Sequence, residues 1–155
     1  MPIKKVIKVV KVDKGVLAPK KTEDKIKEES VIKKIKVLVV EDDFSIATMY
    51  KVAFENDGFT FFTTDKGEEA IKIAETERPD AILLDIILPQ WDGFTILTNL
   101  KKNDKTKGIP VMMLTNLSQK SDKDRGLALG ALDYFPKSQF TPTQILLKVK
   151  EIIKK

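Results

Sequence analysis

Four short strand-like segments, each followed closely by a charged or hydroxyl side chain, constrain the fold of this chain more than any other feature. They are residues 35–40 with Glu41-Asp42-Asp43, residues 81–84 with Asp85, residues 111–114 with Thr115, and residues 133–135 with the nearby Lys137. Because the carboxyl ends of parallel strands meet at one edge of an open sheet, we expect these side chains to lie together. Carboxylates gathered in this way repel one another unless a divalent cation joins them. The pattern therefore predicts a site for a hard cation with oxygen ligands.

Between these segments the hydrophobic spacing alternates between the strand and helix periods. Strands are predicted over residues 35–40, 59–63, 81–85, 110–114 and 132–135, and helices over residues 44–56, 66–77, 92–103, 119–129 and 141–153. In the first helix, the apolar residues Ile46, Met49, Tyr50, Ala53 and Phe54 recur at helical spacing. Regular alternation of strand and helix implies an α/β fold, a doubly wound five-stranded parallel sheet with right-handed crossovers.

The composition excludes several classes of site. Cysteine and histidine are both absent, which removes disulfides, thiolate metal sites, the usual zinc ligand and the commonest general base. No apolar run approaches the roughly 20 residues that span a bilayer, and the lysine-rich start lacks an apolar signal-peptide core. We therefore expect a cytoplasmic protein.

The net charge of +5 is unevenly distributed along the chain. Residues 1–34 hold 11 lysines against 5 acids, whereas the remainder holds 17 basic and 18 acidic residues. We predict a basic N-terminal extension over residues 1–34 and a folded domain over residues 35–155. The β-branched, lysine-rich composition favours a flexible or loosely docked arm, with a strand or helix packed on the domain or on a second copy as the alternative. Such an arm could touch an acidic partner or a polyanion.

Four motifs in this order resemble the receiver domain of two-component response regulators, the CheY-like family. They are residues 37–43, residues 79–89 with Asp92-Gly93, residues 110–115 and residues 130–137. The likeness begins near residue 34 and covers about four-fifths of the chain. It implies a flavodoxin-like (βα)5 domain with strand order 2-1-3-4-5, acting as a phosphorylation switch and not as a turnover enzyme.

The resemblance also implies a role for each residue at the predicted sheet edge. Asp85 matches the phosphoacceptor, and Lys137 and Thr115 match the residues that contact the phosphoryl group. Glu41, Asp42, Asp85 and the backbone carbonyl of Ile87 match the ligands of Mg²⁺. Tyr134 matches an aromatic switch that turns inward as Thr115 moves. These matches follow the motifs above residue by residue.

Partners follow from the same resemblance. A histidine kinase or phosphotransfer protein supplies the phosphoryl group, and a downstream protein binds the face made by the fourth helix, fifth strand and fifth helix. The resemblance is also compatible with a homodimer. The main alternative is a receiver-like adaptor that is never phosphorylated. A flavin or dinucleotide binder is disfavoured, because Glu41-Asp42-Asp43 occupies the loop that would have to hold phosphate.

Some positions permit a structural explanation or depart from the family pattern. Asp43 is expected to be a helix N-cap and not a third metal ligand, and Trp91 a packing residue. Ser138 follows Lys137 where the family has proline, which leaves open whether the peptide bond is trans or a strained cis bond. Ile87 and Leu117 are apolar at the two positions where the family can have a polar side chain that orients the water for dephosphorylation. Because no such side chain is present, a long-lived phosphoryl group is predicted.

Overall fold

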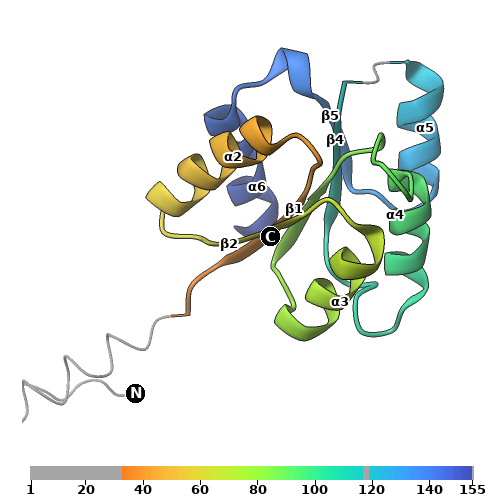
Figure 1. The fold of residues 1–155 in the computed structure, drawn as a ribbon, viewed down its shortest axis with the longest axis horizontal. Helices are drawn as coiled ribbons and strands as arrows, with labels where there is room; N and C mark the ends of the chain where they lie inside the picture. The colour runs from red at the N-terminus through yellow and green to blue at the C-terminus, as the bar shows by residue number, and fades with distance from the viewer. Residues whose placement is uncertain (1–32, 117–118, 155) are drawn as a thin grey trace, which may run out of the picture. The chain divides into compact units, whose positions relative to one another are not determined.

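The computed structural model describes residues 33–116 and 119–154. Within these ranges the helices and strands alternate along the chain as predicted (Figure 1). The strands are β1 (Lys36–Val40), β2 (Thr60–Thr64), β3 (Ala81–Leu84), β4 (Val111–Thr115) and β5 (Asp133–Pro136). The helices are α2 (Phe44–Asn56), α3 (Gly67–Glu77), α4 (Gly93–Lys102), α5 (Lys120–Ala128) and α6 (Pro142–Lys154), with a short 3₁₀ turn, η1 (Lys137–Gln139).

The five strands form one parallel sheet in the order β2-β1-β3-β4-β5. This confirms the predicted fold class, including the strand order that the family resemblance implies. The order reverses direction at β1, which pairs with β2 on one side and β3 on the other. In open sheets of this kind the crevice beyond the carboxyl ends at such a switch point is where sites form.

Helices cover both faces of the sheet. In Figure 1, α2 and α6 lie on one side, and α3, α4 and α5 lie on the other. Successive side chains of a strand point to opposite faces, so Leu38 and Val40 join the core beneath α3 and α4, while Val37 and Val39 join the core beneath α2 and α6. β3 divides in the same way and is buried throughout. Burial on both faces explains why the central strands are continuously apolar in the sequence.

The ends of the helices follow local chemistry. Gly58 and Gly130 have φ angles of +91° and +109°, the left-handed conformation that commonly ends a helix. At the start of α6 the Thr141 Oγ1 accepts a hydrogen bond from the Gln144 amide at 3.1 Å, and the Gln144 side chain accepts one from the Thr141 amide at 2.8 Å. This reciprocal capping confirms the helix start predicted at Thr141-Pro142.

The apolar spacing that predicted the first helix does not by itself identify its buried face. Met49 is 53% exposed, and the buried residues of α2 are Ala47, Tyr50 and Phe54. The apolar residues of this helix extend around much of its circumference, so their spacing alone did not fix which of them face the sheet.

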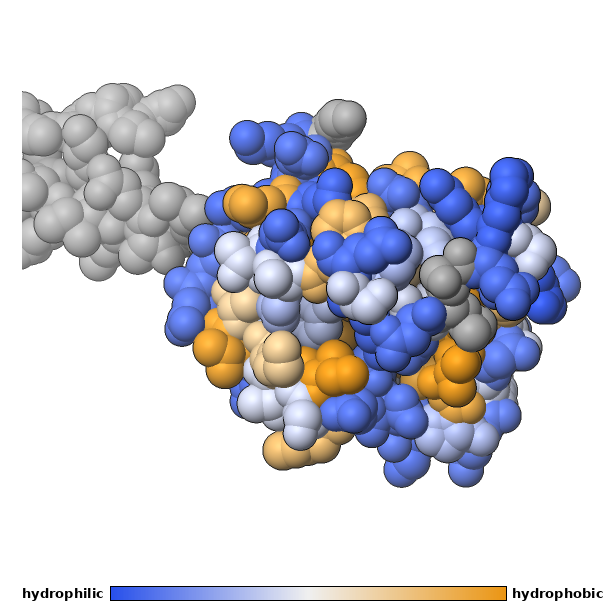
Figure 2. All heavy atoms as spheres, turned by 90° about the horizontal axis from the view of Figure 1, so that it is seen from above, coloured by the Kyte–Doolittle hydropathy of each residue, from blue (hydrophilic) through white to orange (hydrophobic). Residues whose placement is uncertain are grey.

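The face of the molecule in Figure 2 carries separate hydrophobic patches among hydrophilic residues.

The structure bears differently on the predicted N-terminal extension and on the peptide bond after Lys137. The basic extension lies outside the described residues except for Lys33 and Lys34, so the boundary at residue 35 remains a prediction. No peptide bond among the described residues is cis, and the bond between Lys137 and Ser138 is therefore trans. Within the described part of the chain, no helix is both long and apolar enough to cross a membrane.

Candidate functional site

Three carboxylates meet at the carboxyl edge of the sheet. Glu41, Asp42 and Asp85 each place one oxygen so that the three oxygens lie within 4.8 Å of one another. Glu41 and Asp85 are buried, whereas Asp42 is exposed. The cluster therefore opens to solvent on the Asp42 side. A set of oxygen donors with an open side suits a hard divalent cation that keeps some of its water.

The register of the sheet brings these acids together. Val40 pairs with Leu84 across β1 and β3, so the next residue of each strand, Glu41 or Asp85, stands at the same level. The Asp85 amide donates to the Val40 carbonyl at 3.1 Å, and the Glu41 amide donates to the Thr64 carbonyl at 3.0 Å. Backbone hydrogen bonds thus hold both acids at adjacent strand ends.

Lys137 lies against both buried acids. Its ammonium donates to Asp85 Oδ2 at 2.8 Å and also to Glu41 Oε2. The Lys137 side chain is only 10% exposed, and those of Glu41 and Asp85 are 2% and 8% exposed. The structure therefore places one buried cation between two buried carboxylates, and the trans bond before Ser138 does not prevent this contact.

Burial affects the ionisation of this cluster. It raises the pKa of Glu41 above its usual value of 4.5, although the hydrogen bond from Lys137 partly opposes the shift. For Lys137 burial acts to lower the pKa, but the hydrogen bonds to Asp85 and Glu41 outweigh it and raise the pKa. Burial, with the nearby charges of Glu41 and Asp85, raises the pKa of Tyr50 to about 12. Tyr50 was not singled out from the sequence as a neighbour of this site.

Asp43 has the structural role predicted for it. Its Oδ1 accepts a hydrogen bond from the Ile46 amide at 3.0 Å, which caps the start of α2. Its backbone amide donates to Glu41 Oε1 at 3.0 Å. Asp43 therefore orients Glu41 through its backbone, and its own carboxylate belongs to the helix cap.

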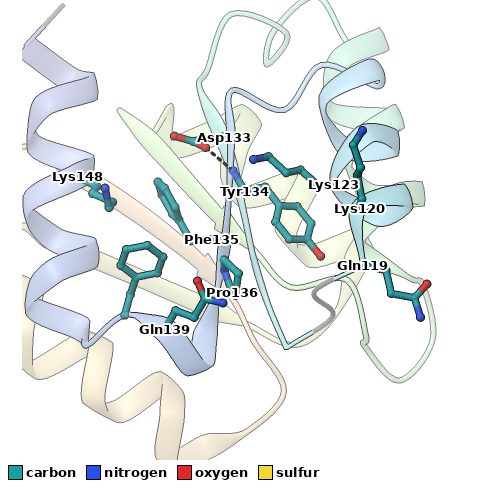
Figure 3. A pocket seen from close by; sticks show the side chains of 10 residues that line it. Gln119, Lys120, Lys123, Asp133, Tyr134, Phe135, Pro136, Gln139 and Lys148 are labelled. Carbon is teal, nitrogen blue, oxygen red and sulfur yellow. Dashed lines mark hydrogen bonds between the residues drawn. The ribbon is translucent and has the colours of Figure 1, made fainter.

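Thr115 and Tyr134 lie on the neighbouring strands. Thr115 ends β4 and is fully buried, and Tyr134, on β5, is 6% exposed. The Tyr134 side chain points from β5 toward α5 in Figure 3. Burial and the charges of Asp122 and Asp85 raise its pKa. The two residues thus lie on paired strands beside the site, while the predicted coupled movement of Thr115 and Tyr134 remains a proposal.

The segment after Asp85 connects the cluster to α4. Ile87 is 58% exposed, and its amide lies 3.3 Å from Asp85 Oδ1. Trp91 is half-buried and packs against the core beneath α3 and α4, which confirms a packing role. Leu117, the other apolar position connected with phosphoryl lifetime, lies outside the described residues. The predicted long lifetime therefore stays a prediction.

A groove of about 500 Å³ lies between α5, β5, η1 and α6 (Figure 3). Its wall includes the aromatic side chains of Tyr134, Phe135 and Phe140. Three lysines also line it, Lys120, Lys123 and Lys148, and the Lys148 amine lies 5.2 Å from the centre of the Phe140 ring. The groove thus combines apolar surface with positive charge on the face that the family resemblance predicts for partners.

Comparison with known proteins identifies a family for this arrangement. The family model described as the response regulator receiver domain matches residues 37–150. The alkaline phosphatase synthesis transcriptional regulatory protein PhoP of Bacillus subtilis (strain 168) is 41% identical over 120 residues, which are 77% of this chain and 49% of the relative. The phosphate regulon transcriptional regulatory protein PhoB of Escherichia coli (strain K12) is 34% identical over 77% of this chain and 52% of its own length. The chain spans about half the length of these relatives.

Solved structures agree with this comparison. A putative response regulator from Chloroflexus aurantiacus J-10-fl has a TM-score of 0.73 and 32% identity, over 79% of this chain and 100% of that one. Vibrio cholerae chemotaxis protein CheY4 has a TM-score of 0.72 and 29% identity, over 77% of this chain and 99% of that one.

Proposed function

Since this chain belongs to the response regulator receiver family, we propose that it is a phosphoacceptor switch of a two-component phosphorelay. Asp85 accepts a phosphoryl group from a histidine kinase or phosphotransfer protein. A P–O bond to the Asp85 carboxylate forms as the P–N bond of phosphohistidine breaks, and the imidazole leaves. The observation that carries this proposal is the contact of Lys137 with both Asp85 and Glu41 beside the exposed Asp42.

The donor set of the pocket suits Mg²⁺, which takes oxygen ligands. Glu41, Asp42 and Asp85 would hold it with their carboxylates, together with the backbone carbonyl of Ile87. When bound, Mg²⁺ supplies positive charge against the transferring phosphoryl oxygens. The exposed Asp42 leaves one side of the cluster accessible to a phosphodonor.

The protein's own residues serve the transfer through charge and position. Lys137 is a compact cation already in contact with Asp85, and it can pair with the phosphoryl oxygens after transfer. The Thr115 hydroxyl, buried at the end of β4, supplies a hydrogen-bond donor for the same group. A shift of Thr115 toward the phosphoryl group alters the packing around Tyr134, and this two-state change is the proposed output.

The proposed output surface is the groove between α5, β5 and α6. Aromatic side chains and three lysines line it, and Tyr134 connects it to the strand edge that carries the site. We propose that a downstream protein binds there. Formation of a homodimer, and contact of residues 1–34 with an acidic partner or polyanion, are further proposals. The cytoplasmic location predicted from the sequence also stays a prediction.

Phosphorylation in vitro tests this function. The protein is incubated with Mg²⁺ and acetyl phosphate, and its intact mass and Trp91 fluorescence are recorded. We expect the wild type to gain one phosphoryl group, Asp85→Asn to gain none, and Asp104→Asn, which changes a carboxyl that is 92% exposed, to behave like the wild type. A wild type that gains no phosphoryl group would favour the alternative of a non-phosphorylated adaptor. Trp91 lies six residues after Asp85 and packs on the core, so its emission reports on the segment nearest the acceptor.

A further inference from the structure

The segment between Asp85 and α4 is held closely at its far end. The Gly93 amide donates to the Ile86 carbonyl at 2.7 Å. A Cβ atom on Gly93 would lie 2.1 Å from the Asp85 carbonyl oxygen, far inside van der Waals contact. The start of α4 therefore rests directly on the backbone of the proposed phosphoacceptor, and residues 86–92 form a loop that leaves and returns beside it.

Trp91 fixes this loop at a second point, on α3. A Cβ atom on Gly67 would lie 2.5 Å from Cε3 and 2.7 Å from Cδ2 of the Trp91 indole. The ring thus packs on the backbone of the first residue of α3, and only a residue without a side chain allows this approach. Gly67 is buried, and the half-buried Trp91 also packs against the core, so the contact joins the loop to the hydrophobic core.

The start of α3 is in turn connected to Glu41. The Thr64 carbonyl accepts the hydrogen bond from the Glu41 amide at 3.0 Å, and the Thr64 Oγ1 accepts one from the Lys66 amide at 3.1 Å. The same hydroxyl donates to Glu69 in the first turn of α3 at 2.5 Å. Gly67 lies between these two attachments, so the backbone that Trp91 contacts is linked through Thr64 to a proposed cation ligand.

We propose that the packing of Trp91 on Gly67 is a positioning contact for the divalent-cation site. It fixes the loop that carries Ile87 relative to Glu41, and so sets where the Ile87 carbonyl stands relative to the carboxylates that the strand register already holds together. This inference rests on the proposed function and extends it to two residues that contact neither the cation nor the phosphoryl group. Outer residues that orient metal ligands commonly change metal affinity by roughly 10- to 100-fold when they are altered.

A Mg²⁺ titration of the 155-residue protein, followed by NMR peak shifts, tests this inference. In Gly67→Ala the added methyl displaces the indole, and we expect the Mg²⁺ dissociation constant to rise by roughly 10-fold. Gly108→Ala is the matched control, because a Cβ atom at Gly108 meets no atom within 4 Å and its φ is not in the left-handed range. The control should keep the wild-type affinity.

Hydrogen exchange in protein treated with a chelator gives a readout that does not depend on the cation. The amides of Ile87 and Gly93 should exchange faster in Gly67→Ala than in the wild type or in Gly108→Ala. If Gly67→Ala keeps the wild-type affinity and the wild-type exchange rates, the contact is ordinary packing and the inference is overturned.

Trp91→Leu provides the second variant, since it opens space and introduces no clash. It should also weaken Mg²⁺ binding, and adding Gly67→Ala to it should cost less than Gly67→Ala costs in the wild type. Wild-type affinity in Trp91→Leu overturns the inference even if Gly67→Ala fails to fold. A wild type that binds no Mg²⁺ and accepts no phosphoryl group instead rejects the proposed function, and the inference with it.

Discussion

The ammonium of Lys137 lies 2.8 Å from Oδ2 of Asp85, although 52 residues separate the two in the chain. The same ammonium contacts Glu41, which is 96 residues away. The ends of three strands thus converge on one buried cation. This relationship gives the strand edge both its charge balance and its proposed chemistry.

Removing the Lys137 charge should destabilise the fold. In Lys137→Met the buried carboxylates of Glu41 and Asp85 lose their cation, and breaking a buried ion pair from one side commonly costs about 3 kcal/mol or more. We expect that loss in the free energy of unfolding, measured by urea denaturation at pH 7 in the presence of a chelator. Lys120→Met is the control, because Lys120 pairs with Asp124 at the same 2.8 Å distance on the exposed surface. It should unfold at the wild-type urea concentration, and equal losses in both variants would contradict this explanation.

Neutralising Glu41 should have the opposite effect on stability. Burial raises the pKa of Glu41 in the folded state above 4.5. The folded protein therefore binds a proton at this carboxyl more tightly than the unfolded chain does. Stability from this group is complete below pH 4.5 and is lost as the pH rises through the folded-state pKa. Glu41→Gln, which stays neutral, should therefore be more stable than the wild type at pH 7 and equally stable below pH 4.5.

Unfolding curves at several pH values, recorded with a chelator, measure this difference. Glu55→Gln, which alters an exposed carboxyl near the end of α2, is the control and should show no such pH-dependent gain. A Glu41→Gln protein that is less stable than the wild type at pH 7 would show that the ion pair with Lys137 outweighs the cost of burial.

Asp42 and Asp43, adjacent in sequence, should separate cation binding from folding. Asp43→Ala removes the α2 cap and should cost about 1 kcal/mol of stability while leaving Mg²⁺ affinity close to that of the wild type. Asp42→Ala removes an exposed member of the carboxylate cluster and should weaken Mg²⁺ binding with little change in stability. Thermal unfolding and Mg²⁺ titration of both variants check this, and the reverse pattern would exchange the two assignments.

Gly93→Ala should disturb the acceptor strand itself. The added methyl would lie 2.1 Å from the Asp85 carbonyl oxygen, so the backbone must move, and overpacking of this kind typically costs about 1–3 kcal/mol. We expect reduced stability together with slower phosphorylation by acetyl phosphate. Gly108→Ala, in open space, should change neither property. Wild-type phosphorylation kinetics in Gly93→Ala would show that the Asp85 backbone tolerates the shift.

Much of the fold could be predicted because its determinants are local. Continuous apolar runs predicted the strands, and the observed bounds differ from the predicted ones by only one residue at most strand ends, as at β2 (Thr60–Thr64). The Asp43 cap was predicted correctly because a cap joins atoms only three residues apart. The exposure of Met49 could not be predicted in this way, because the apolar residues of α2 do not form one narrow stripe, and the sheet and α6 decide which of them are covered.

The sequence by itself determined the order of strands and helices and which side chains stand at the carboxyl ends of the strands, because hydrophobic period, caps and turns act over a few residues. Only the tertiary structure decided that Lys137 reaches both Asp85 and Glu41 across a trans bond to Ser138, and that the Trp91 ring lies on Gly67. Those contacts join segments that are distant in the chain. Their geometry depends on strand register and on how closely two backbones approach, and neither is encoded in the spacing of residues along one segment.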